Sequence, residues 1–151
     1  MSEMKIAIGG DHAGFELKQE LVAYVKELGH DVVDCGTDST APVDYPDFAR
    51  KVGESVRDHR VDRGIVVCGS GAGATVAANK INGVRAALAH DTYSAHQCVE
   101  HDDVNVLTMG SRIIGVALAR EVVAAFVRAQ YTGEERHARR LAKVLQIEAE
   151  N

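Results

Sequence analysis

The chain has 151 residues, and its 17 Lys and Arg against 22 Asp and Glu give a formal net charge of −5. This length, with 46% hydrophobic and 26% charged residues, is typical of one globular domain with a buried core. The acidic balance, with no Trp and 5% aromatic residues, argues against a nucleic-acid partner, which needs basic surfaces and stacking side chains. Apolar runs are too short for a bilayer span or a signal peptide, so we expect no membrane partner and a cytoplasmic protein.

Short apolar runs alternate with segments of helical periodicity along the chain. The runs are apolar on both faces, which is typical of a parallel sheet covered by helices on both sides. We therefore predict a single α/β domain over residues 1–151, with a doubly wound five-stranded parallel sheet of the Rossmann-like or flavodoxin-like kind and an extra C-terminal helix. In chain order the expected elements are a strand at 5–8, a helix at 13–28, a strand at 30–35, a loop at 36–46, a helix at 47–57, a strand at 64–68, a glycine turn at 69–73, a helix at 74–80, a strand at 85–89, a helix at 93–100, a strand at 105–109, and helices at 114–128 and 134–148.

The three cysteines, Cys35, Cys68 and Cys98, are odd in number and include no Cys-x-x-Cys pair. We therefore expect no disulfide framework and a reducing compartment. Free cysteine is most often a buried packing residue, so a reactive role needs a special setting.

Ligands of open parallel sheets bind beyond the carboxyl ends of the strands. The chemically reactive residues of this chain fall mostly in the loops at those ends, which favours an enzyme. The loops are 9–12, the segment around Tyr45, 68–73, 90–91 and 110–112.

Cys68 is followed by three glycines in five residues, Gly69, Gly71 and Gly73. Such a turn lets backbone amides converge on an anion, and the helix expected next adds its positive end. A thiol there should ionise more easily, so Cys68 is a candidate base or nucleophile, or else simply the last buried residue of a strand. The turn also fits a dinucleotide-binding pattern ending at Ala74, but that pattern normally follows the first strand, so a nucleotide-binding module is the weaker alternative.

Two other segments carry candidate acid–base groups. Asp11 and His12 suit a substrate hydroxyl or proton transfer, or alternatively a cap on the first helix. Carboxylates flank His101 on both sides and should favour its protonated form, unless the segment is a solvated helix end. The spacing of His90, His96 and His101 puts them on no common helix face, so we expect no metal site.

The C-terminal segment contains Arg136, His137, Arg139 and Arg140 within five residues, and Arg112 follows the fifth strand. In an acidic protein such a cationic cluster suits a phosphate. The alternative is a solvated helix face whose arginines pair with neighbouring glutamates.

The sequence motifs together form an ordered set that covers nearly the whole chain. They resemble those of the ribose-5-phosphate isomerase B family, which includes galactose-6-phosphate and allose-6-phosphate isomerases. The resemblance implies aldose–ketose isomerisation of a sugar phosphate through an enediolate, without metal or nucleotide cofactor, and first of all conversion of ribose 5-phosphate to ribulose 5-phosphate in the pentose phosphate pathway. The motifs are GGDHAGFELK, CGT, DYPDFA, VCGSGAGATVAANK, GVRAALAHDTYSA, EHDDVNVLTMGSRIIG and RHARR.

The resemblance also implies roles for single residues. Cys68 moves the proton between C1 and C2, Ser70 relays a proton between the two oxygens, and His101 opens the sugar ring. The family's site is shared by two subunits, with the His101 segment and the C-terminal helix supplied by the partner, so we expect at least a homodimer, and a tetramer stays open. The implied binding residues are Asp11, His12 and Tyr45 for the sugar, Gly69, Gly71, Ala72 and Gly73 for the enediolate oxygen, Asp102 beside His101, and Arg112, Arg136, His137 and Arg140 for the phosphate.

One position departs from the family pattern, because Asp102 stands where many members have Asn. An ionised Asp only accepts hydrogen bonds and adds negative charge, so we expect it to tune the choice of sugar. Some relatives use a carboxylate further along the glycine turn as base, but this chain has only Ala72, Ala74 and Thr75 there. Isomerases of allose, galactose or tetrulose phosphates, and a non-catalytic sugar-phosphate-binding protein, remain alternatives.

Overall fold

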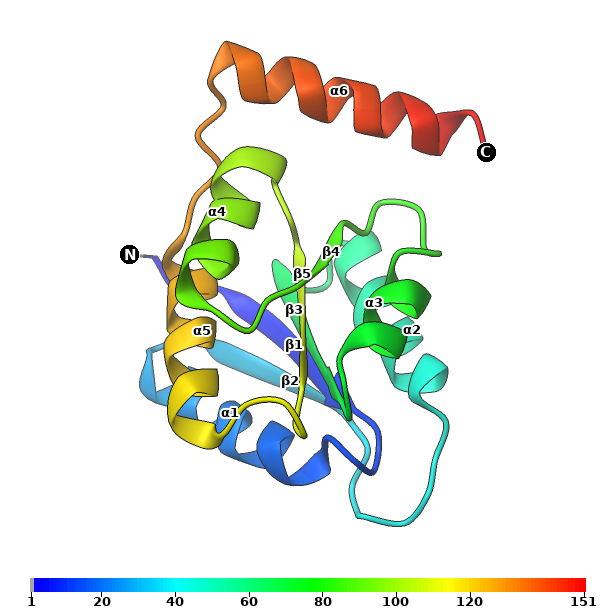
Figure 1. Cartoon of the computed structure of the whole chain (residues 1–151), viewed down its shortest axis with the longest axis vertical. Helices are drawn as coiled ribbons and strands as arrows, with labels where there is room; N and C mark the ends of the chain where they lie inside the picture. Colours follow the sequence, from blue (N-terminus) through cyan, green and yellow to red (C-terminus); the bar gives the residue numbers. More distant parts are fainter. Residues whose placement is uncertain (1) are drawn as a thin grey trace.

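The computed structural model describes residues 2–151, which form a five-stranded parallel sheet with helices on both faces (Figure 1). The fold class predicted from the sequence is thereby confirmed. The strands are β1 (Lys5–Gly10), β2 (Asp31–Gly36), β3 (Arg63–Cys68), β4 (Ala86–Leu88) and β5 (Val106–Gly110), and the helices are α1 (Phe15–Glu27), α2 (Tyr45–Arg57), α3 (Ala72–Ala78), α4 (Thr92–Asp102), α5 (Val116–Arg128) and α6 (Glu135–Ala149).

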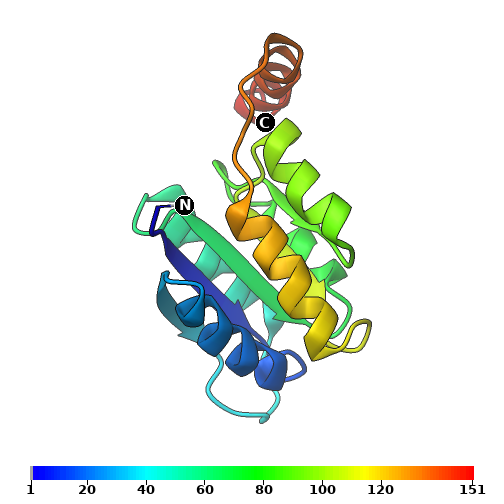
Figure 2. The same ribbon diagram turned by 90° about the vertical axis from the view of Figure 1, so that its left-hand side faces the viewer.

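Two hydrophobic layers hold the helices against the sheet. Helices α1, α4 and α5 cover one face, as Figure 2 shows, while α2 and α3 cover the other. Neighbouring strand residues contribute to opposite layers, because successive side chains of a strand point to opposite sides. In β3, Ile65 and Val67 pack toward α1 and α5, whereas Val66 and Cys68 pack toward α2 and α3. This double coverage is the reason why the strands are continuous apolar runs.

The strands lie in the order β2-β1-β3-β5-β4. A flavodoxin-like sheet has the order 2-1-3-4-5, so here the last strand is inserted between β3 and β4. The chain changes direction across the sheet between β1 and β3, and the helices that follow these two strands cover opposite faces. Such a switch point leaves a crevice at the carboxyl ends of the two strands. Asp11 and Cys68 lie at this crevice, where the Asp11 N–H donates to Val67 O at 3.3 Å.

Two helices, α2 and α3, begin two residues earlier than the sequence predicts. Helix α2 starts at Tyr45, because Pro46 fits the first helical turn, where no intrahelical N–H is needed. Helix α3 starts at Ala72, directly after Gly71 in the left-handed conformation at φ +84°. Ala72 and Gly73, expected in the turn, therefore belong to the helix.

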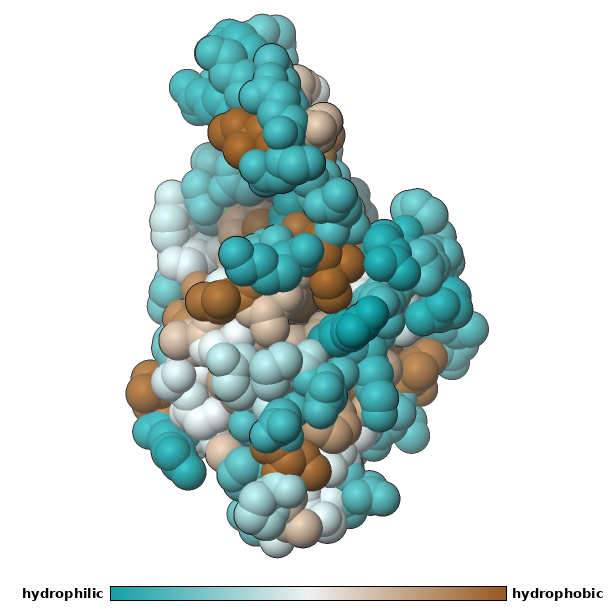
Figure 3. Space-filling view, turned by 90° about the vertical axis from the view of Figure 1, so that its right-hand side faces the viewer, coloured by the Kyte–Doolittle hydropathy of each residue, from teal (hydrophilic) through white to brown (hydrophobic). Residues whose placement is uncertain are grey.

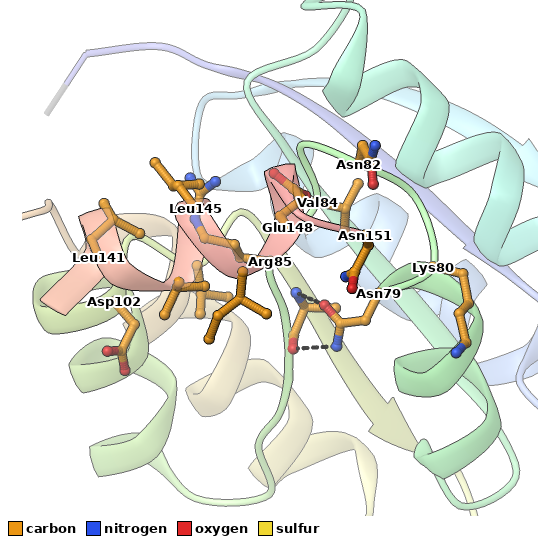
Figure 4. A pocket seen from close by; sticks show the side chains of 14 residues that line it. Asn79, Lys80, Asn82, Val84, Arg85, Asp102, Leu141, Leu145, Glu148 and Asn151 are labelled. Carbon is orange, nitrogen blue, oxygen red and sulfur yellow. Dashed lines mark hydrogen bonds between the residues drawn. The ribbon is translucent and has the colours of Figure 1, made fainter.

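Helix α6 projects beyond the layered part of the molecule (Figures 1 and 2). Its one buried residue is His137, and Val144, Leu145 and Ile147 expose much of their apolar surface. A hollow of about 690 Å³ lies between this helix and the β4 region. Figure 3 shows apolar side chains on both sides of it, and Figure 4 shows Leu141 and Leu145 of α6 together with Val84 among the residues that line it. None of the helices in residues 2–151 has the length and apolar character that a membrane crossing requires.

Candidate active site

A cavity of about 380 Å³ lies at the carboxyl ends of β1, β3 and β5. It gathers residues from four of the loops where the sequence predicts chemistry, although they are distant in the chain. The hollow beside α6 is larger than this cavity, so cavity size alone does not locate these groups. The smaller cavity is lined by Asp11, His12, Ala13, Tyr45, Cys68, Gly69, Ser70, Gly73, Arg112 and Ile113.

Cys68 is the last residue of β3, and it is buried except for 5% of its surface. Its Sγ accepts the backbone N–H of Gly71 at 3.2 Å. This contact requires glycine, because a Cβ at this left-handed position would lie 2.9 Å from both Leu88 Cδ1 and the Met109 carbonyl carbon. An N–H that donates to sulfur interacts more strongly with a thiolate than with a thiol. Cys68 is thus both a packed strand residue and part of the cavity wall.

The glycine turn directs two of its amides at its own side chains. Besides the Gly71 N–H, the Ala72 N–H donates to Ser70 Oγ at 3.2 Å. The turn is held from behind by Thr75, whose Oγ1 donates to the Gly71 carbonyl at 2.7 Å and contacts Thr108 Oγ1 at 2.5 Å. The oxyanion-binding role of residues 69–73 stays a prediction. The N–H groups that donate to Cys68 and to Ser70 belong to neighbouring residues of this turn.

The first loop is organised by side-chain contacts to backbone. Asp11 is buried, and its Oδ1 accepts the N–H of Gly14 at 3.0 Å, so it closes the turn before α1 and is not the cap of the helix. His12 Nδ1 lies 3.1 Å from the Val43 backbone nitrogen and 3.2 Å from the Val43 carbonyl oxygen, so these contacts hold the ring in place with either tautomer. The His12 ring is thereby held at Val43 while it lines the cavity.

Tyr45 and Arg112 complete the cavity from its sides. The Tyr45 ring packs over α3, where a Cβ on Gly73 would lie 2.6 Å from its Cε1. The Arg112 guanidinium lies over Gly69, at 3.5 Å from the position of a Cβ there. Arg112 is exposed and carries positive charge beside the glycine turn, as binding of a phosphate requires.

The other expected site residues lie at the opposite end of the sheet. Helix α4 runs back from the end of β4 toward the starts of β4 and β5, where Arg85 Nε donates to the carbonyl of Asp103 at 2.8 Å (Figure 1). His101, Asp102, Arg136, His137 and Arg140 are therefore gathered near the end of α4 and the start of α6. In one chain the structure does not bring them to Cys68.

His101 and His137 form a stacked pair with ring centroids 4.0 Å apart and planes at 25°. His137 is buried, and its Nδ1 lies 2.7 Å from Thr132 Oγ1. Burial lowers the pKa of His137, and the charges of His101 and Arg136 act in the same direction. Protonation of His137 is therefore disfavoured beside the positive charges of its neighbours.

Two of the carboxylates expected to favour protonated His101 are engaged elsewhere. Glu100 contacts His96 Nδ1 at 2.8 Å, and Asp103 pairs with Arg85 at 3.2 Å. The nearest polar partner of His101 is instead a neutral amide, because Gln97 Nε2 lies 2.8 Å from His101 Nδ1.

In α6, the alternative interpretation of the charge cluster holds for two arginines. Arg136 forms an ion pair with Glu134, and Arg139 pairs with Glu135 at 2.9 Å. Both pairs are solvent-exposed, so they hold these side chains weakly. Arg140 is exposed on the same helix.

Sequence reasoning missed several residues around these two places. Ile113 and Ala13 line the cavity, and Ser111 Oγ donates to the Ala13 carbonyl at 2.7 Å and so joins two loops. Only the i, i+4 spacing of Gln97 and His101 was a usable signal, since side-chain pairs at that spacing meet on a helix. Within residues 2–151, no three His, Cys, Asp or Glu side chains are grouped as metal ligands would be.

Comparison with known proteins assigns the family. A model of the ribose/galactose isomerase family matches residues 6–144. Ribose-5-phosphate isomerase B of Escherichia coli is 46% identical over 144 residues, which cover 95% of this chain and 96% of the relative. The structure of ribose-5-phosphate isomerase B from Clostridium thermocellum has a TM-score of 0.95 at 45% identity, covering 97% of this chain and 99% of that one. The Mycoplasma genitalium enzyme with bound ribulose 5-phosphate has a TM-score of 0.92 at 38% identity, covering 100% and 99%. The chain therefore belongs to the ribose/galactose isomerase family.

Proposed function

We propose that the protein isomerises ribose 5-phosphate to ribulose 5-phosphate in the cytoplasm, without a metal or other cofactor, as one domain comprising the whole chain. The observation that carries the proposal is the position of Cys68, whose Sγ accepts the Gly71 N–H in the wall of a cavity at the switch point of the sheet. Family membership and the names of the relatives support the choice of reaction and sugar. Pure binding would require no base at this position.

The proton transfer in this mechanism uses groups that line the cavity. In the open-chain aldose, the Cys68 thiolate takes the proton of C2, the C2–H electron pair forms the C1–C2 double bond, and the C1 oxygen becomes the enediolate oxygen. Amides of residues 69–73 stabilise that oxygen. The proton then passes from Sγ to C1 while O2 loses its proton and the C2 carbonyl forms, and Ser70 Oγ carries the proton between the two oxygens. Asp11, His12 and Tyr45 hold the sugar hydroxyls.

The remaining groups come from a second subunit in this proposal, because one chain holds them at the far end of the sheet. His101 of the partner subunit gives a proton to the ring oxygen as the C1–oxygen bond breaks, and the anomeric hydroxyl loses its proton to water. Arg112 binds the phosphate together with Arg136 and Arg140 of the partner subunit, with His137 beside them. Asp102 lies next to the ring-opening group. A homodimer with two shared sites is the smallest such assembly, and a tetramer would pair two dimers.

The first experiment measures ketose formation from ribose 5-phosphate with EDTA present. Wild type should turn over and Cys68→Ala should lose activity by at least about a hundredfold, because the base is removed. Cys98→Ala is the matched control, since Cys98 is also a free, buried thiol and its burial raises its pKa to about 11. Loss of wild-type activity in EDTA contradicts the metal-free mechanism. Sugar-phosphate binding without turnover of any tested pentose, hexose or tetrose phosphate would indicate a non-catalytic binding protein.

The second experiment tests the shared site by subunit mixing. Cys68→Ala and His101→Ala should each be inactive toward ribose 5-phosphate. After joint unfolding and refolding in equal amounts, about half of the dimers are mixed, and each mixed dimer has one intact site, so about a quarter of wild-type activity should return. No recovery, or an active monomer in sedimentation, would contradict the shared site.

A further inference from the structure

Gln97 is the only side chain in residues 2–151 that contacts a ring nitrogen of His101 within hydrogen-bond distance, with Nε2 at 2.8 Å from Nδ1. Both residues lie on α4 at i, i+4 spacing, which brings their side chains together on one helix face. The opposite contact of the imidazole is its stacking on the buried ring of His137. The His101 ring is thus held both at one edge and on one face.

This contact assigns different tasks to the two ring nitrogens. With the amide nitrogen turned toward Nδ1, as here, Nδ1 of neutral His101 is the acceptor and Nε2 carries the ring proton. If Nδ1 becomes protonated, rotation of the same amide presents Oε1 as acceptor. A carboxylate in this place would suit only protonated Nδ1. The neutral amide keeps Nδ1 occupied in either state and leaves Nε2 to exchange a proton.

The flanking carboxylates do not take the place of Gln97: two are engaged by other residues, and Asp102 makes no hydrogen bond to the His101 ring within residues 2–151. Glu100 is engaged by His96 Nδ1 at 2.8 Å, and Asp103 by Arg85 at 3.2 Å. His137 is itself held by Thr132 Oγ1 at 2.7 Å, so it supports the ring of His101 by stacking.

We propose that Gln97 is a positioning residue for ring opening: it holds Nδ1 of His101 and so fixes the ring orientation in which Nε2–H faces the ring oxygen of the sugar bound in the partner subunit. The inference rests on the proposed function, which gives His101 the ring-opening role. Gln97 itself does not touch the substrate. Its loss should therefore slow only the step that needs a correctly oriented His101.

Two reactions separate ring opening from proton transfer at carbon. Conversion of ribose 5-phosphate needs both steps. Ribulose 5-phosphate is acyclic, because the hydroxyl that could close a five-membered ring on C2 carries the phosphate, so exchange of its C1 hydrogen with D2O needs only the Cys68 step. Gln97→Leu should lower kcat for ribose 5-phosphate by about tenfold, with a smaller change in KM, and leave the exchange rate within about twofold. Gln146→Leu is the matched control, because Gln146 makes an exposed i, i+4 contact to Glu150 on α6.

A spectroscopic readout tests the geometry without turnover. In 15N-labelled protein, the ring signals of His101, assigned with His101→Gln, should show a hydrogen-bonded Nδ1 in wild type and lose that signature in Gln97→Leu. Equal slowing of both reactions, unchanged kcat, or an Nδ1 without a hydrogen bond in wild type would each overturn the role of Gln97. An inactive wild type with the expected hydrogen bond at Nδ1 would instead overturn the proposed function, so the two failures are distinguishable.

Discussion

Arg63 joins the start of β3 to the end of α5, and its replacement should weaken the fold. Its guanidinium donates to the carbonyls of Phe126 at 2.6 Å and Ala129 at 2.7 Å. The last carbonyls of a helix have no intrahelical partner, so these bonds take the place of a C-terminal cap. Burial lowers the pKa of Arg63, and Asp103 and Asp62 oppose that shift. Beyond this cap, residues 129–134 lead to α6, which carries the proposed phosphate ligands.

The size of the effect follows from these two short bonds. A hydrogen bond to a charged group contributes about 1.5–3 kcal/mol. Part of that is regained in Arg63→Met, because the variant no longer keeps a guanidinium away from water and the freed carbonyls are partly hydrated. We therefore expect the free energy of unfolding to fall by about 3 kcal/mol. Arg50→Met is the matched control, since Arg50 pairs with Glu54 at 3.2 Å on an exposed helix face, and it should cost below about 0.5 kcal/mol.

Urea unfolding followed by circular dichroism measures both variants against wild type. The protomer concentration is held constant, because an oligomer's apparent stability depends on it. The midpoint should fall in Arg63→Met with an unchanged slope. A loss below about 1 kcal/mol, or one equal to that of Arg50→Met, would refute the capping role of the guanidinium.

Three further predictions concern packing, sugar choice and pH. Gly14→Ala should lower the free energy of unfolding by about 3 kcal/mol or more, because the added Cβ would lie 2.1 Å from the Val67 backbone oxygen. Gly115→Ala is the control, since a Cβ there meets nothing within 4 Å, and equal urea midpoints of the two variants would contradict the prediction. Asp102→Asn should change the relative kcat/KM among pentose, hexose and tetrose phosphates, and an unchanged kcat/KM for every sugar tried would count against its role in specificity. The pKa of His137 is lower in the folded chain than the ordinary 6.5, so its contribution to stability is complete above about pH 6.5 and is lost as the pH falls below it. The thermal midpoint measured from pH 8 to pH 5 should therefore fall less steeply in His137→Gln than in wild type, and equal slopes would speak against this assignment.

Much of the fold could be predicted because its signals are local. Ile65, Val66 and Val67 are all apolar because both faces of β3 are covered, and this pattern alone indicates a parallel sheet between two helix layers. The loops after the strands, with Asp11 and Cys68, follow from the rule that ligands meet the carboxyl ends of such sheets. The start of α2 at Tyr45 was missed by two residues, because a proline next to a helix start is compatible with either side of the boundary.

The sequence by itself thus determined the class of the fold, the candidate site residues and the reaction implied by the resemblance of its motifs to a known family. Each of these depends on neighbouring residues or short motifs. Only the tertiary structure decided the insertion of β5 between β3 and β4, since strand neighbours are chosen by packing across the whole sheet. It also decided that Cys68 receives the Gly71 N–H and that Gln97 takes the place beside His101 expected for carboxylates. The tertiary structure likewise decided that Cys68 and His101 lie far apart within one chain. Helix α4 runs back to the far end of the sheet, and the number of residues between Cys68 and His101 does not reveal that direction.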